Sequence, residues 1–153
     1  MFHLQTNVDG QELEADVDAQ SLLLEVLRGA GHIAPKEGCG IGVCGACTVL
    51  VDDVPVSSCS YPAVLASDRE VWTAEGLSSR FPDVRDRVLQ EQALQCGACT
   101  PGQFTAICAL ALSPDKDSLD SEEKVRDYMS GNLCRCTGYE ALIRAAQGVL
   151  GHE

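Results

Sequence analysis

The sequence lacks the features that mark several protein classes. No apolar run approaches the roughly 20 residues that a helix needs to cross a bilayer. Residues 1–6 carry neither a basic nor an apolar segment, so we expect no secretory signal and a cytoplasmic location. No phosphate-binding glycine loop, Ser–His–Asp pattern or paired carboxylates can be recognised. The chain therefore offers no visible substrate site of its own.

Aromatic residues and positive charge are also scarce. Aromatic residues make up 5% of the chain, so the core must be built mostly from Leu, Val and Ala. The chain has 11 Lys and Arg residues and 23 Asp and Glu residues, which gives a formal net charge of −12. A surface of this charge repels nucleic acid phosphates, so we exclude a nucleic acid partner. The acidity indicates a well-solvated surface.

Cysteine, in contrast, is abundant. The chain holds nine cysteines, and without an export signal they indicate metal or redox chemistry rather than disulfides. Eight of them form two groups of four. The ninth, Cys108, lies on the apolar face of an expected helix and is predicted to be a core residue. His3, His32 and His152 do not cluster in the sequence, so we expect none of them to bind a metal.

Residues 1–76 predict a small sheet with one helix. Apolar and polar residues alternate on both sides of Asp9-Gly10, which predicts a hairpin. Ser21 is the predicted N-cap of a short helix that ends at Gly29 to Gly31. The expected strands cover residues 2–8, 13–17, 48–51, 54–56 and 71–73.

Residues 77–153 change to helical spacing. A first helix is expected over residues 83–94, and Ser113-Pro114 ends the second. The predicted N-caps of the later helices are Thr100, Asp120 and Thr137. The chain is therefore predicted to have an α+β fold, with a sheet-containing domain over 1–76 and a bundle of about four helices over 77–153.

The first cysteine group indicates an iron–sulfur cluster. Cys39, Cys44 and Cys47 have the C-x4-C-x2-C spacing of plant-type [2Fe–2S] ferredoxins, and Cys59 follows. Four glycines between residues 38 and 45 allow the backbone to wrap closely and turn N–H groups toward sulfur. Zinc sites more often use paired C-x2-C units, and disulfides need export. The short spacing to Cys59 fits a free soluble ferredoxin poorly.

The second cysteine group leaves two alternatives open. Cys96 and Cys99 form one pair, and Cys134 and Cys136 form another. Two such pairs suit either a structural zinc or a second [2Fe–2S] cluster. C-x-C is tight for a zinc ribbon, and helix ends expected beside both pairs favour bound negative charge. The pattern favours iron and sulfide over zinc.

Three segments together closely resemble the small iron–sulfur subunit of the xanthine oxidase family of molybdenum hydroxylases. They read GCGIGVCGACTV at 38–49, QCGACTPG at 95–102 and SGNLCRCTGY at 130–139, in family order. The resemblance covers nearly the whole chain. It implies a ferredoxin-like β-grasp domain over 1–76, followed by a helical [2Fe–2S] domain over 77–153. The implied ligands are Cys39, Cys44, Cys47 and Cys59 for the first cluster and Cys96, Cys99, Cys134 and Cys136 for the second.

The resemblance also implies a function and partners. The chain would relay electrons from a molybdopterin centre in a large subunit toward FAD in a medium subunit, or toward another acceptor. Gln95 and Cys136 match positions that contact the pterin. The chain departs from the family at Asp53, at Ala98 and around Pro35, without losing a ligand. The alternatives are a free two-cluster electron carrier and a zinc-binding interaction module.

Overall fold

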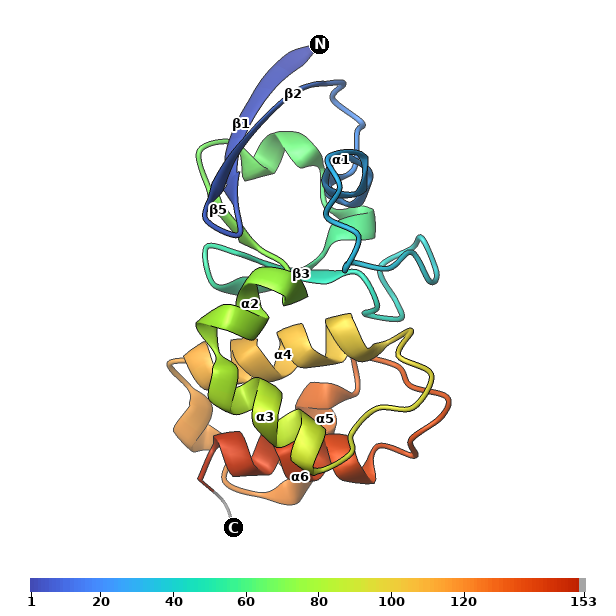
Figure 1. Cartoon of the computed structure of the whole chain (residues 1–153), viewed down its shortest axis with the longest axis vertical. Coiled ribbons are helices and arrows are strands. Elements are labelled where there is room, and N and C mark those ends of the chain that lie inside the picture. The colour runs from blue at the N-terminus through green and yellow to red at the C-terminus, as the bar shows by residue number, and fades with distance from the viewer. Residues whose placement is uncertain (152–153) are drawn as a thin grey trace.

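The computed structural model describes residues 1–151, so His152 lies outside the described residues. A five-stranded sheet with one packed helix lies toward the N-terminal end of the long axis, and the other helices gather toward the C-terminal end (Figure 1). The predicted α+β fold class is confirmed. Within the described residues, no helix is both long and apolar enough to span a bilayer.

All five predicted strands are present. The sheet has the order β2-β1-β5-β3-β4, in which β1 and β5 run parallel and the other neighbours run antiparallel. Asp9 and Gly10 both adopt positive φ angles, 53° and 83°, in the predicted hairpin turn. The strands are β1 (Phe2–Val8), β2 (Gln11–Val17), β3 (Thr48–Val51), β4 (Val54–Ser57) and β5 (Glu70–Trp72).

Helix α1 (Leu23–Gly29) covers one face of this sheet and starts later than predicted. Its N-cap is Leu22 rather than Ser21. The Ser21 carbonyl accepts a hydrogen bond from Ala63 N (2.8 Å), and Leu22 forms a bridge with Pro62. These tertiary contacts keep the segment extended, so the helix begins only afterwards. A core forms below α1 from Val8, Leu13, Leu23, Leu27, Val49, Val51, Ala66 and Val71.

Helix α4 is the centre of the helical part. Its residues 102–110 are all buried, because α4 lies between strand β3 and helix α6 (Figure 1). A helix that is apolar on every side needs such packing all round. The helices are α2 (Ala74–Arg80), α3 (Pro82–Gln90), α4 (Thr100–Leu112), α5 (Glu122–Met129) and α6 (Glu140–Val149). Short 3-10 turns lie at Ser58–Ser60, Ala63–Ala66 and Lys116–Ser118.

Two helix predictions for the C-terminal half were wrong. The sequence did not predict α2, whose N-cap Thr73 accepts a hydrogen bond from Glu75 N. Helix α3 ends at Gln90 rather than at residue 94, because Gln92 turns the chain with a φ of 52°. The predicted domain boundary after residue 76 falls within α2. The division into domains stays a prediction.

The predicted N-caps of α4, α5 and α6 were also displaced. Thr100 is the first residue of α4, after Cys99 as N-cap. Ser121 rather than Asp120 caps α5, while the Asp120 carboxylate pairs with Lys124 Nζ at 2.8 Å. Thr137 does not cap α6, which begins after Tyr139 with a φ of 69°. At α5 and α6 the polar side chain that was expected to cap the helix has a different partner, Lys124 for Asp120 and Cys134 for Thr137.

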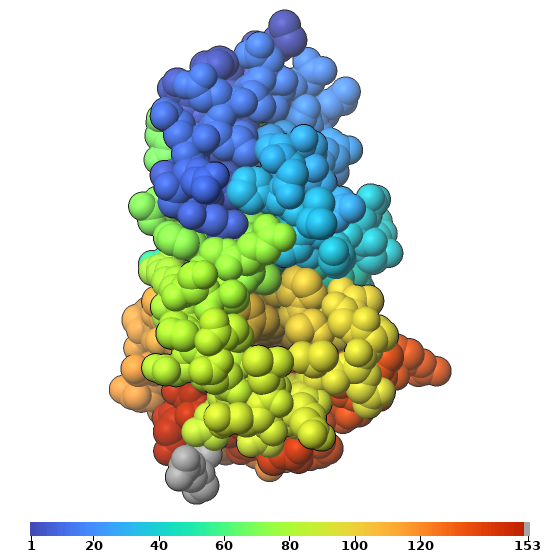
Figure 2. Space-filling model, viewed as in Figure 1, coloured from blue at the N-terminus to red at the C-terminus, as the bar shows by residue number. Residues whose placement is uncertain are grey.

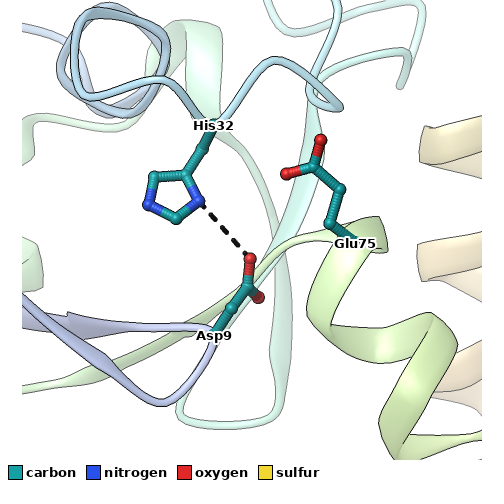
Figure 3. Close-up of side chains that lie close together, drawn as sticks. All are labelled: Asp9, His32 and Glu75. Carbon is teal, nitrogen blue, oxygen red and sulfur yellow. Dashed lines mark ion pairs between the residues drawn. The ribbon is translucent and has the colours of Figure 1, made fainter.

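A polar cluster joins the β1–β2 turn to the start of α2. Figure 3 shows the side chains of Asp9, His32 and Glu75 close together, with the His32 Nδ1–Asp9 Oδ2 distance at 3.5 Å. Both Asp9 oxygens accept hydrogen bonds from fully buried Thr73, one from its backbone N (2.7 Å) and one from its hydroxyl (2.6 Å). Asp9 therefore serves as the acceptor that satisfies Thr73 where β5 passes into α2.

Asp9→Asn should lower the free energy of unfolding by about 1–2 kcal/mol, because one buried donor of Thr73 loses its acceptor. Asparagine tolerates the positive φ angle at this position, so the backbone is not a second cause. Thermal unfolding of the variant measures the effect. Asp16→Ala is the control, since the Asp16 carboxylate is exposed and pairs with His3, which is exposed as well. Equal melting midpoints for both variants would contradict this role of Asp9.

Candidate functional site

The fold brings the first four cysteines together. Cys39, Cys44 and Cys47 lie on the loop between α1 and β3, and Cys59 lies in the 3-10 turn after β4. Cys39 is a hydrogen-bonding neighbour of Cys44, and Cys59 of Cys47. Cys47 and Cys59 are only 1% and 4% exposed, while the other two are partly exposed. This site is thus half buried against the sheet domain.

Backbone N–H groups of the loop point at these sulfurs. Positive φ angles at Gly40, Gly42 and Gly45 give the chain the curvature that this requires. The bonds to Cys39 Sγ come from Ile41 N (3.5 Å), Val43 N (3.3 Å) and Cys44 N (3.4 Å). Gly42 N donates to Cys59 Sγ (3.2 Å), and Cys59 N donates to Cys47 Sγ (3.4 Å). Such donors stabilise negative charge on sulfur.

The thiols of this group differ in acidity. The backbone donors, Ile41 N first, lower the pKa of the Cys39 thiol to about 6. Burial, and next the neighbouring Cys47, raise the pKa of the Cys59 thiol to about 11. A buried sulfur of this kind ionises readily only beside a positive metal centre. The four sulfurs of this group therefore do not ionise equally readily.

The second four cysteines meet between two helix connections. Cys96 and Cys99 lie between α3 and α4, and Cys134 and Cys136 lie between α5 and α6. The sulfurs of Cys96 and Cys136 are 3.5 Å apart, and Cys99 is a hydrogen-bonding neighbour of Cys134. Thr137 donates to Cys134 Sγ from its hydroxyl (3.2 Å) and from its backbone N (3.5 Å).

In both groups the sulfurs associate in pairs. Among residues 1–151, no three cysteine sulfurs all lie within 4.8 Å of one another. The three candidate ligands that do lie this close are Asp9, His32 and Glu75. A tetrahedral zinc with bonds of about 2.3 Å holds its sulfurs about 3.8 Å apart. Pairs of thiolates instead suit two irons, each with two cysteine ligands. The donor set and its spacing fit a [2Fe–2S] cluster at each site.

Two family models match the chain. A 2Fe-2S iron-sulfur cluster binding domain matches residues 6–76, and a [2Fe-2S] binding domain matches residues 73–147. The xanthine dehydrogenase iron-sulfur-binding subunit of Escherichia coli O157:H7 is 37% identical over 142 residues, which cover 92% of this chain and 89% of the relative. The chain belongs to the [2Fe–2S] subunits of the xanthine oxidase family of molybdenum hydroxylases.

Other members of the molybdenum hydroxylase family also match this chain over most of its length and of their own. One subunit of the nicotinate dehydrogenase of Pseudomonas putida is 37% identical over 147 residues, covering 94% of this chain and 92% of the relative. A crystal structure of quinoline 2-oxidoreductase from Pseudomonas putida 86 contains a chain with a TM-score of 0.83 and 37% identity, covering 98% and 94% of the two chains. This iron–sulfur subunit is therefore a component of an oxidoreductase, as predicted.

The other residues singled out in the sequence can now be placed in this iron–sulfur subunit. Gln95 and Cys136, the predicted pterin contacts, are exposed on the two loops that meet at the Cys96–Cys136 contact. Cys108 is fully buried in α4, where burial raises the pKa of its thiol to about 12, and the prediction of a core role is confirmed. His3 lies on the surface beside Asp16.

Sequence reasoning missed two buried amide side chains close to both cysteine groups. Asn132 is 8% exposed and Gln103 is 1% exposed. Gln103 lies in a largely apolar stretch of α4, and Asn132 lies two residues before Cys134. A polar residue in an expected core position is a signal for a specific hydrogen-bond network.

Proposed function

We propose that this chain holds two [2Fe–2S] clusters and relays electrons one at a time through a molybdenum hydroxylase. The proposed ligands of the first cluster are Cys39, Cys44, Cys47 and Cys59, and those of the second are Cys96, Cys99, Cys134 and Cys136. The pairing of sulfurs within each group is the observation that carries this proposal. A [2Fe–2S] cluster supplies reversible one-electron oxidation and reduction when bound.

The chain's own residues would hold each cluster in position and stabilise the negative charge on its sulfurs. The N–H groups of residues 41–44 stabilise negative charge at the first site, and the buried thiols of Cys47 and Cys59 anchor that site to the sheet domain. Thr137 gives the same support to Cys134 at the second site. Two sites at fixed positions allow an electron pair from a two-electron oxidation to pass stepwise.

The arrangement of the loops supports partners on one side of the molecule. The cysteine-bearing loops, blue-green, yellow and red in Figures 1 and 2, all lie on the right of that view. We propose that a large molybdopterin-binding subunit docks at the second site, where Gln95 and Cys136 are exposed. We propose that a FAD-binding medium subunit, or another acceptor, docks at the first site. The substrate is then bound by another subunit, in agreement with relatives named for xanthine, nicotinate and quinoline.

Iron, acid-labile sulfide and zinc content of the purified chain test this function. Two clusters require about four irons and four sulfides per chain, a brown colour and two distinct EPR signals after reduction. Co-purification with larger subunits separates a hydroxylase component from a free carrier. Zinc in place of iron in preparations competent for cluster assembly would overturn the proposal.

A further inference from the structure

The Asn132 side chain bonds to parts of both cysteine sites. Its amide Nδ2 lies 3.0 Å from Gly45 O in the first cysteine loop, 3.1 Å from Thr48 Oγ1 at the start of β3 and 3.2 Å from Gly102 O in the first turn of α4. Asn132 itself belongs to the loop that carries Cys134. One buried amide group therefore joins three segments that are up to 87 residues apart in sequence.

Gln103 fixes Asn132 from the other side. The Gln103 Nε2 donates a short hydrogen bond to the backbone carbonyl of Asn132, while its Oε1 is buried and has no hydrogen-bond partner among residues 1–151. An unpartnered buried carbonyl costs free energy, and an aliphatic side chain at this point of the core would avoid that cost. The contact with Asn132 offsets part of the cost and holds the loop before Cys134 against α4.

The backbones of the two sites also touch directly beside Asn132. Leu133 N donates to the carbonyl of Cys44 at 2.9 Å, so a proposed ligand of the first cluster bonds to the residue before a proposed ligand of the second. A Cβ on Gly45 would lie 2.5 Å from Asn132 Nδ2, and a Cβ on Gly102 would lie 2.0 Å from Gly45 O. The first cysteine loop therefore packs so closely against Asn132 and Gly102 that neither Gly45 nor Gly102 has room for a side chain.

We propose that Asn132 is a positioning residue that sets the separation of the two clusters, and through it the rate at which electrons pass between them. The inference rests on the proposed function. Electron tunnelling slows steeply as the distance between two centres grows. Asn132 controls that distance because Gly45 lies next to Cys44 and Asn132 lies close to Cys134, so any movement of the amide shifts ligands at both sites.

Asn132→Asp in the assembled enzyme tests the inference. The carboxylate has nearly the same shape but donates nothing to Gly45 O, Thr48 Oγ1 or Gly102 O, and its charge repels the two carbonyls. We expect iron content to stay at about four per chain. The magnetic interaction between the two reduced clusters in EPR should weaken. Electron transfer between them, followed by rapid reduction kinetics, should be slower than in the wild-type enzyme, because the two clusters lie farther apart.

Ser130→Ala is the matched control, because the Ser130 hydroxyl donates only within its own segment, to Asp127 O at 2.6 Å. It should leave iron content, magnetic interaction and transfer rate unchanged. Thr48→Val is a second variant that leaves Asn132 its bonds to Gly45 O and Gly102 O but removes its bond to Thr48 Oγ1, together with the bond from Thr48 Oγ1 to Gly45 O (2.7 Å), and it should slow transfer by a smaller factor.

The outcomes separate the inference from the function on which it rests. Wild-type protein without two clusters would refute the proposed function. Two clusters in the wild type with unchanged magnetic interaction and transfer rate in iron-replete Asn132→Asp would refute the inference alone. If Asn132→Asp fails to hold iron, the Thr48→Val variant is the test instead. A magnetic interaction and an electron-transfer rate equal to those of the wild type in Thr48→Val would then overturn the inference.

Discussion

Gly102→Ala is expected to destabilise the protein by about 2–4 kcal/mol, as overpacking at a contact that cannot relax does. Gly102 lies in the first turn of α4, where alanine would normally favour the helix by about 1 kcal/mol. The added methyl would instead lie 2.0 Å from Gly45 O and 3.0 Å from Ala46 Cα. Both neighbours are backbone atoms of the first cysteine loop, so the steric cost exceeds the helical gain.

Thermal unfolding of the iron-loaded chain, with iron content measured beside it, checks the Gly102 prediction. The control is Gly29→Ala at the end of α1, where an added Cβ meets nothing within 4 Å. That change should leave the melting midpoint equal or slightly higher. A Gly102→Ala variant as stable as the Gly29→Ala variant would show that the two sites do not need this close approach.

Cys47→Ser should remove the first cluster and stop electron delivery beyond the second. Cys47 is 1% exposed, and its side chain is a hydrogen-bonding neighbour of Cys59. A serine hydroxyl is a much poorer ligand for iron at neutral pH, since it does not ionise as a thiol does. Iron should fall from about four to about two per chain, and one of the two EPR signals should disappear.

Cys108→Ala is the control for Cys47→Ser, because Cys108 is equally buried but belongs to the core of helix α4 and to neither cysteine group. It should retain about four irons even if the core loses some stability. Full iron content in Cys47→Ser would contradict the ligand assignment of the first site. Equal iron loss in both variants would show that iron binding follows general stability rather than particular sulfurs.

Local sequence patterns predicted much of this fold. The strands of the β1–β2 hairpin were predicted because alternation and the Asp9-Gly10 turn are short-range signals. The helix starts were less accurate, because residues near them take part in other contacts. Thr137 is an example, since its hydroxyl donates to Cys134 Sγ instead of capping α6. The start of α1 is another, because pairing with Pro62 holds Leu22 extended.

The sequence predicted which cysteines form the two groups, but not the long-range contacts around them. Cysteine spacing located the two groups, since ligands of one cluster are concentrated in short loops. The pairing of Cys96 with Cys136 across 40 residues needed the folded chain. The contact of Asn132 with Gly45 had no sequence signal of its own, because nothing local relates residues 87 apart. Long-range hydrogen bonds between backbone and amide groups are not visible in residue patterns.

The unequal exposure of the two cysteine groups has a consequence for the lifetime of the protein outside its complex. Cys47 and Cys59 are sheltered by the sheet domain, whereas Cys96 and Cys136 are open to solvent in the single chain. Oxygen and chelators reach solvent-accessible sulfurs first. In a chain stored alone in air, the proposed second cluster would therefore be lost first, and the proposed large subunit would protect it by covering Cys96 and Cys136.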